Sequence, residues 1–280
     1  MKKATVIIIS VVLVVGFLAL VYYGVTHSRG VPVSVTELPP NVVEVLPAEK
    51  ALNLKEGISP EEWLSFPPYE IKMLHQAMVL PWGKDLISPI SVRSFHNNKD
   101  IYVYVQWSDE TESRTLGINE FSDACAIMFP LEKEVVPSTI MMGFMGKSNL
   151  WQWTARQDSE YWLKEEVPTT PYVDFNYPFE SAELFPVSRP GLRSSVNDLI
   201  AVRVGTITLK EAQEVSGRGV YKNGVWHVVF KRSLNITQAD QGPGFLSGQK
   251  TSCVIAVWNG AKSDRGGRKS ISNWIELVIK

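Results

Sequence analysis

The sequence predicts an all-β protein, an antiparallel β-sandwich with long loop insertions, preceded by one N-terminal transmembrane helix. The chain has 280 residues, of which 45% are hydrophobic, so it is long enough to bury a large core. Its 19 glycines and 17 prolines are spread along the chain, as is typical of many short strands and turns. Beyond the first 25 residues, helical periodicity is weak and short apolar runs are separated by turn residues.

The N-terminal 28 residues are predicted to be a membrane anchor. Lys2 and Lys3 precede an uncharged run from residue 4 to residue 25, which as a helix would span roughly 33 Å. A cleaved signal sequence is the alternative, but the run is longer than is usual for one and lacks a small-x-small cleavage site. With the lysines on the cytoplasmic side, we expect a single-pass protein of the cytoplasmic membrane whose C-terminal domain is periplasmic.

Residues 29–62 are polar and rich in proline, which predicts a stalk and an entry segment to the domain, and residues 63–280 are predicted to form the sandwich domain itself. Ser59 and Pro60 suit the N-cap and the first position of a short helix at 59–63. Asn223-Gly224 predicts a tight hairpin, and the proline-rich stretch 156–199 predicts a long insertion. The predicted strands are 87–95, 101–107, 124–129, 150–155, 200–206, 219–222, 225–231, 252–258 and 274–279.

Composition and motifs exclude several classes of function. A net charge of −1 argues against a nucleic-acid-binding protein. Cys125 and Cys253 form no C-x-x-C pair, which excludes an iron–sulfur cluster, a zinc ribbon and covalent c-type haem. The two cysteines are predicted to be either a disulfide or two buried thiols. No nucleophile elbow, P-loop or dinucleotide motif occurs, so we expect no catalytic activity of its own.

One candidate cofactor segment, 137–146, holds three methionines and two glycines and leads into a Trp-x-Trp motif. A thioether is a soft, neutral ligand that suits haem iron, and glycine lets a flat macrocycle approach the backbone. The alternative is that these methionines fill irregular gaps in the core. The residues concerned are Met141, Met142, Met145, Trp151 and Trp153.

A second candidate segment is the glycine-rich loop between the last two predicted strands. Its basic side chains either face solvent or pair with carboxylates, including the propionates of a cofactor. His96 and His227 are rival ligands, but a histidine inside a predicted strand is more typical of a hydrogen-bonded core residue. The cations of the loop are Lys262, Arg265, Arg268 and Lys269.

Six motifs that follow one another between residue 63 and the C-terminus carry a family resemblance. They are 63–81, 100–111, 123–130, the Met-Gly pair before 151–153, 256–260 and 269–274. In this order they resemble the haem-binding gamma subunits of periplasmic molybdenum enzymes of the dimethyl-sulfoxide reductase superfamily. That family includes the gamma chains of ethylbenzene and dimethyl-sulfide dehydrogenases, of chlorate and selenate reductases and of nitrite oxidoreductase, and its domain type is the cytochrome c-552/DMSO reductase-like haem-binding domain.

The resemblance implies one non-covalent b-type haem in the sandwich, with one methionine and one lysine as axial ligands. The family lysine falls on Lys269 and the methionine on Met142, with Met145 and Met141 as alternatives. A lysine binds iron only as the neutral amine, and burial beside the macrocycle and the charge of the iron both favour that form. Haem-pocket roles are implied for Trp151, Trp153, Trp258 and Arg268.

The resemblance also implies an electron-transfer subunit. It would relay electrons between the iron–sulfur subunit of a complex with a molybdopterin catalytic subunit and an external carrier such as a c-type cytochrome. Two alternatives are a haem-free sandwich module that binds carbohydrate or another ligand, and a structural tether of such a complex. Haem content distinguishes both alternatives from the electron-transfer subunit.

Overall fold

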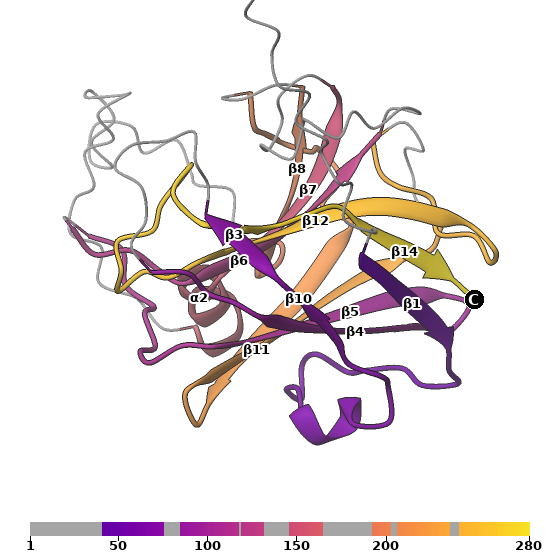
Figure 1. Cartoon of the computed structure of the whole chain (residues 1–280), viewed down its shortest axis with the longest axis horizontal. Coiled ribbons are helices and arrows are strands. Elements are labelled where there is room, and N and C mark those ends of the chain that lie inside the picture. The colour runs from indigo at the N-terminus through magenta and orange to yellow at the C-terminus, as the bar shows by residue number, and fades with distance from the viewer. Residues whose placement is uncertain are drawn as a thin grey trace, which may run out of the picture. The chain divides into compact units, whose positions relative to one another are not determined.

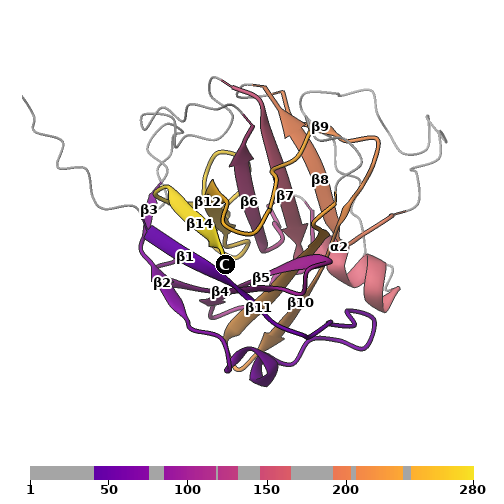
Figure 2. The ribbon, with the colours of Figure 1, turned by 90° about the vertical axis from the view of Figure 1, so that its right-hand side faces the viewer.

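A continuous path of hydrogen-bonded strands folds into two layers that pack face to face (Figures 1 and 2). The computed structural model describes residues 41–75, 85–117, 119–131, 146–164, 192–202, 206–235 and 241–280. Residues 40–280 form one compact unit. The prediction of an all-β protein is confirmed.

The first layer has the strand order β10-β11-β5-β4, with β2 paired to β4. All of its pairings are antiparallel, and the hairpin between β10 and β11 turns at Asn223 and Gly224, which both have positive φ. The predicted hairpin is therefore confirmed. The strands are β2 (Tyr69–Ile71), β4 (Ile90–His96), β5 (Asp100–Ser108), β10 (Val215–Lys222) and β11 (Val225–Ser233).

The second layer has the order β14-β12-β6-β7-β8-β9, and β13 pairs with both β12 and β3. Its pairings are also antiparallel. The strands are β3 (Met73–His75), β6 (Ala124–Pro130), β7 (Ser148–Thr154), β8 (Val196–Ala201), β9 (Thr208–Leu209), β12 (Lys250–Trp258), β13 (Ser270–Ser272) and β14 (Ile275–Ile279).

Strand β1 (Asn41–Pro47) joins the two layers. Residues 41–45 pair with β14 and residues 46–47 pair with β4, and both pairings are parallel. Val43 and Val45 are fully buried, so burial of apolar surface holds this strand in the sandwich. The sequence predicted a stalk and entry segment over 29–62 and an antiparallel sandwich. The structure instead places a core strand inside that segment, with two parallel pairings.

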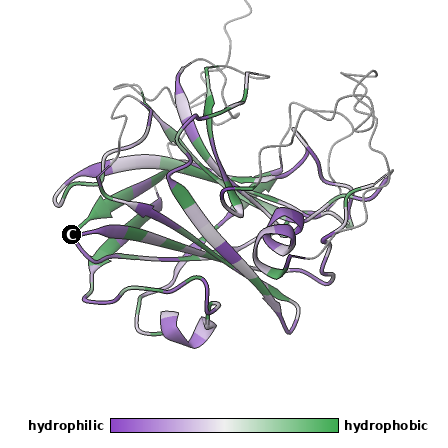
Figure 3. Cartoon of the chain, turned by 180° about the vertical axis from the view of Figure 1, so that it is seen from behind, coloured by the Kyte–Doolittle hydropathy of each residue, from purple (hydrophilic) through white to green (hydrophobic). Residues whose placement is uncertain are grey.

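The core lies between the layers because alternate residues of the long strands point inward. Hydrophobic residues recur along the strands of both layers, as the colours of Figure 3 show. Trp107, Trp153 and Trp226 meet at its centre, with ring centroids 5.0 to 6.3 Å apart. On the outer face of the first layer, the 3-10 helix η1 (Pro60–Trp63) brings Trp63 onto Tyr104, with 4.7 Å between ring centroids. This second apolar cluster fixes the segment that follows β1.

Short elements and capping account for most other differences from the sequence prediction. Each predicted strand overlaps an observed one, although the strand predicted at 200–206 is β8, which begins at Val196. Pro60 begins η1 as expected, whereas the Ser59 hydroxyl donates to the Glu61 side chain and forms no cap. The predicted insertion begins with α2 (Ala155–Asp158) and the π-helix η3 (Ser159–Leu163).

Cys125 and Cys253 are free and fully buried, which agrees with the alternative of two buried thiols. The predicted N-terminal anchor lies outside the described residues and stays a prediction. Among the helices that the structure describes, none is long and apolar enough to cross a membrane.

Candidate functional site

Lys269 is the residue directly before β13, and its amine is buried. The residue is 4% exposed, and Nζ lies 5.0 Å from the ring centroid of Trp258 and 3.4 Å from the carbonyl oxygen of Gly266. No carboxylate of the described residues forms an ion pair with it. Desolvation therefore lowers the pKa of Lys269 from 10.5 to about 7. At neutral pH about half of the molecules carry the neutral amine, which is a ligand for a metal.

The outer face of the second layer is flat and apolar next to this amine. Ala126 lies opposite Ala256 across the β6–β12 pair, and Ala124 lies opposite Trp258. These four residues are 2 to 5% exposed and form one cluster, which we call the alanine face. The methyl side chains of alanine project only a short distance from the sheet, so a flat ring can lie close to the backbone. The face continues into an apolar cluster of Met128, Leu150, Leu199, Ala201, Val254 and Ile271.

The loop 259–268 connects Trp258 to Lys269 and returns on itself. Asn259 N–H donates to Asp264 Oδ2 at 3.1 Å, and Ser263 N–H donates to the Gly260 carbonyl at 2.9 Å. The Gly266 carbonyl accepts from both Trp258 Nε1, at 3.0 Å, and Lys269 Nζ. The loop therefore holds the indole and the amine against one common acceptor.

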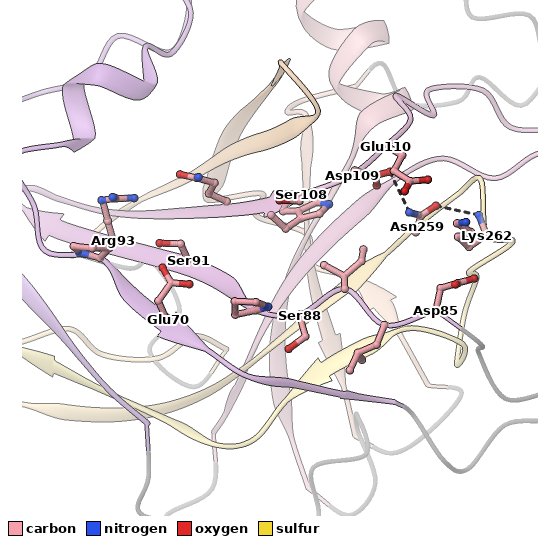
Figure 4. A pocket seen from close by; sticks show the side chains of 16 residues that line it. Glu70, Asp85, Ser88, Ser91, Arg93, Ser108, Asp109, Glu110, Asn259 and Lys262 are labelled. Carbon is pink, nitrogen blue, oxygen red and sulfur yellow. Dashed lines mark hydrogen bonds between the residues drawn. The ribbon is translucent and has the colours of Figure 1, made fainter.

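Two buried carboxylates hold the start of this loop. Asn259 Nδ2 donates to Asp109 Oδ1 at 3.1 Å, as Figure 4 shows, and Gly260 N–H donates to Asp123 Oδ1 at 2.8 Å. Burial, with a smaller contribution from the charge of Asp109, raises the pKa of Asp123 to about 6. Desolvation also raises the pKa of Asp109. Hydrogen bonds donated to each carboxylate oppose this effect, because they favour the ionised form.

A cleft of about 510 Å³ lies on the other side of this loop (Figure 4). Its walls come from β2, β4, β5 and the loop, and its lining is polar, with Glu70, Arg93, Asp109, Glu110 and Lys262 among the residues. Within the described ranges, no group of three or more His, Cys, Asp or Glu side chains is placed to hold a metal ion. We take Lys269 with the alanine face as the candidate site, because the buried amine lies there.

The structure brings together Lys269 and Trp258 but not the two other predicted pocket tryptophans. Trp151 and Trp153 point to the inner face of β7, where both are fully buried in the core. Trp151 donates to Asn149 Oδ1 and Trp153 donates to Asp158 Oδ1, each at 2.8 Å. Because side chains alternate along a strand, residues 150 and 152 face the Lys269 side instead.

Of the other residues predicted for the site, Arg268 has partners within the fold, and the three methionines are not among the described residues. Arg268 forms an ion pair of 3.5 Å with Asp264 and donates to the Lys262 carbonyl, so its pairing with a cofactor stays a prediction. Met141, Met142 and Met145 lie outside the described residues.

The rival histidines have partners within the fold. His96 Nε2 lies 2.8 Å from the carbonyl oxygen of Lys280, and His227 Nδ1 lies 2.5 Å from the Tyr104 hydroxyl. Burial lowers the pKa of His227. Both are hydrogen-bonded core residues, and for His227 this agrees with its position in a predicted strand.

Sequence reasoning missed the alanine face and the two anchoring carboxylates. The alternation Ala124-x-Ala126-x-Met128 was the available signal for a flat outer face, since it places two methyl groups and a thioether on one side of β6. For Asp109 and Asp123 the only local signal was an acidic residue next to a strand, which is typical of turns.

Comparison with known proteins adds a family and named relatives. The model of the family described as Ethylbenzene dehydrogenase matches residues 61–174 and 176–270. A protein of Haloferax mediterranei named as a heme subunit of a respiratory nitrate reductase is 28% identical over 247 residues, which are 87% of this chain and 75% of that protein. The gamma subunit of chlorate reductase from Ideonella dechloratans is 21% identical over 223 residues, which are 77% and 76%.

Solved structures that resemble this chain share less sequence with it than these two relatives do. A carbohydrate binding module of family 9 from Caldicellulosiruptor kristjanssonii, in complex with glucose, aligns with a TM-score of 0.44 and 8% identity over 85% of this chain and 95% of that one. A similarity of this size carries no argument about function.

The family match covers most of the sandwich and includes the three features from which the site is built: the alanine-bearing strand β6, the loop 259–268 and Lys269. It also agrees with the ordered motifs of the sequence, so the predicted family is confirmed. The chain belongs to the ethylbenzene dehydrogenase family.

Proposed function

We propose that this chain is a haem-carrying electron-transfer subunit of a molybdopterin oxidoreductase complex. The observation that carries the proposal is the buried amine of Lys269, with a pKa lowered to about 7, beside the alanine face. The relatives named as a heme subunit and as a chlorate reductase gamma subunit support it. Without a ligand to bind, a buried amine that lacks a carboxylate partner only destabilises the fold.

The residues of the site fit a b-type haem. Trp258 and the methyl groups of Ala124, Ala126 and Ala256 offer an apolar surface for a flat macrocycle. Lys269 would supply one nitrogen ligand to the iron, and the second ligand we propose is Met142, with Met145 and Met141 as alternatives. When bound, one haem supplies a centre that takes up and releases a single electron. Neutral lysine and thioether ligands together add no charge to the iron site.

The chain's own residues then hold the amine neutral and exclude water. Burial disfavours the ammonium form of Lys269, and the Gly266 carbonyl orients the nitrogen through its 3.4 Å contact. The substrate chemistry belongs to the molybdopterin catalytic subunit. We propose that electrons pass between its iron–sulfur partner subunit and an external carrier such as a c-type cytochrome. We further propose that residues 1–28 anchor the domain on the periplasmic side of the cytoplasmic membrane.

Haem content tests the proposal that the chain carries one b-type haem. The purified full-length chain is expected to give the b-type pyridine haemochrome spectrum with one haem per chain. Lys269→Ala is expected to change the spin state or lose the haem, because the neighbouring loop offers no other neutral amine at this position. Purified protein without b-type bands would contradict the proposal and favour a tether or a haem-free binding module.

A matched pair of methionine variants tests the second ligand. Met142→Leu is expected to change the near-infrared thioether-to-iron signature of the oxidised haem. Met128→Leu is the control, since Met128 faces the same side of β6 but packs against Leu150 and Val254 in an apolar cluster. An altered signature in the Met128 variant and not in the Met142, Met145 or Met141 variants would reject the proposed ligand segment.

Electron transfer and location have separate tests. The reduced holoprotein is expected to reduce an added c-type cytochrome in stopped-flow mixing at a rate that depends on both concentrations. After cell fractionation, the chain is expected to stay with membranes in alkaline carbonate, and spheroplast protease treatment is expected to digest the domain. Release into the soluble fraction would contradict the anchor and leave the haem result unaffected.

A further inference from the structure

Asp123 is connected to Lys269 through one continuous set of contacts. Asp123 Oδ1 accepts from the N–H of Gly260, and Gly260 opens the loop 259–268. The far end of that loop presents the Gly266 carbonyl to the Lys269 amine. Between these ends the loop is closed by its own hydrogen bonds, from Asn259 to Asp264 and from Ser263 to Gly260. These hydrogen bonds join the start of the loop to Asp264, two residues before Gly266.

Both oxygens of the Asp123 side chain accept hydrogen bonds. Oδ2 accepts from Ser113 N–H at 2.7 Å and from Trp226 Nε1 at 2.9 Å, while Oδ1 accepts from Gly260 at 2.8 Å. The residue is fully buried. An asparagine here would have to point its NH2 group at an N–H donor on one of the two sides, so only a carboxylate satisfies this site.

The structure leaves no space for a side chain at Gly260. A Cβ on Gly260 would overlap the backbone oxygen of Phe121, so the loop packs directly against the residues that lead into β6. The second anchor, Asp109 to Asn259, lies one residue away in the same turn. Two buried carboxylates thus fix a turn whose other end orients a buried amine.

We propose that Asp123 is a positioning residue for Lys269, which it holds in the ligating position by fixing the start of the loop 259–268. The proposal rests on the proposed function, in which Lys269 binds the haem iron. Asp123 does not touch the cofactor site itself. Its effect on the iron passes through Gly260 and the closed loop.

The test measures how easily an added ligand displaces Lys269. In the full-length holoprotein, imidazole competes with the amine for the iron, so the apparent affinity for imidazole reports the strength of the lysine bond. Asp123→Asn is expected to raise that affinity about tenfold, the effect of losing one charged hydrogen bond on an equilibrium. A merely structural role would lower the melting temperature and leave the imidazole affinity unchanged.

Asp158→Asn is the matched control. Asp158 is also buried, and its Oδ1 accepts from an indole, Trp153, and from a glycine N–H, Gly219. It makes no contact with the loop, so we expect wild-type imidazole affinity. Asn259→Ala loosens the same turn from the loop side, and is expected to act as Asp123→Asn does even if the Asp123 variant fails to fold.

The outcomes separate the two proposals. Wild-type imidazole affinity in Asn259→Ala, and in Asp123→Asn where it folds, overturns the positioning role. An equal increase in Asp158→Asn also overturns it, because the effect would then follow stability alone. Failure of the proposed function looks different: the wild-type chain would hold no haem, or Lys269→Ala would leave both spectrum and imidazole affinity unchanged.

Discussion

Trp258 and Lys269 share one hydrogen-bond acceptor, the carbonyl oxygen of Gly266, although they stand at opposite ends of a turn. The indole N–H lies 3.0 Å from that oxygen and the amine 3.4 Å, and the amine sits 5.0 Å from the indole ring centroid. The amine is thus fixed by the ring, by the carbonyl and by the path of the loop. Its environment is that of a buried amine rather than of a solvated cation.

Replacing Lys269 by methionine is expected to stabilise the haem-free protein. The buried amine lacks a carboxylate partner, and methionine is similar in length without a group that must be desolvated. We expect the free energy of unfolding at pH 7 to rise by about 1 kcal/mol, measured by urea denaturation of apoprotein. A fall of similar size would show that the amine contributes to the stability of the empty fold.

Ala126→Leu is expected to separate folding from haem binding. A leucine at the centre of the alanine face adds bulk where a flat ring is proposed to lie, and overpacking destabilises by about 1–3 kcal/mol. The far-ultraviolet circular dichroism spectrum should keep its β-sheet form, while haem per chain falls. Val254→Leu, on the same outer face within the apolar cluster, is the control and should keep its haem.

Gly260→Ala is expected to be among the most destabilising alanine substitutions at glycine. The added Cβ would overlap a backbone oxygen, which cannot rotate away, so we expect a loss of about 3 kcal/mol or more. Gly244→Ala is the comparison, because its new Cβ would meet only the flexible Gln249 side chain, at 3.2 Å. Equal unfolding midpoints for the two variants would contradict the close packing of the loop on Phe121.

The stability of the protein is expected to fall as pH rises from about 4 to about 6. Desolvation is the largest cause of the raised pKa values of Asp158 and Asp123, both about 6. In this range the folded state binds more protons than the unfolded state, so raising the pH favours unfolding by about 2–3 kcal/mol per group. Asp158→Asn should roughly halve the fall. Thermal unfolding across this pH range measures it, and an unchanged slope in the variant would refute the assignment.

Cys125 and Cys253 are expected to resist thiol reagents in the folded protein. Both are fully buried, and desolvation raises the pKa of each thiol, so almost no thiolate forms at neutral pH. Mass spectrometry after iodoacetamide treatment should find no label on the native chain and two labels after unfolding in guanidinium chloride. Labelling of either cysteine in the native protein would contradict its buried position in β6 or β12.

The long strands could be predicted because apolar residues that face the core between the layers recur at every second position. In β5 the inward residues Val103 and Val105 recur with that period, and the Asn223-Gly224 turn needs two positive φ angles that these residues tolerate. Strands such as β13, three residues long, give no period to detect, and their pairing depends on partners elsewhere in the chain. β1 was missed because its flanking prolines resemble those of a linker.

Less of the site could be predicted from the residues alone. Lys269 was identified from a family motif, and nothing in a glycine-rich loop with several cations distinguishes a buried amine from a solvated one. The role of Asp123 depends on Gly260, which is 137 residues away in the sequence. Trp151 and Trp153 were predicted for the pocket because they follow the methionine segment, but the pleat of β7 turns them into the core.

The position of β1 ties the completion of this domain to the synthesis of β14. β1 pairs with β14 (Ile275–Ile279), and among the described strands it is the one that connects the second layer to β4. During translation, residues 41–45 lack their partner in β14 until residues 275–279 have left the ribosome. The nascent chain therefore keeps this edge of β1 unpaired while the more than 200 residues between the two strands are made. A C-terminal truncation before Ile275 would leave that edge permanently open to pairing with other chains.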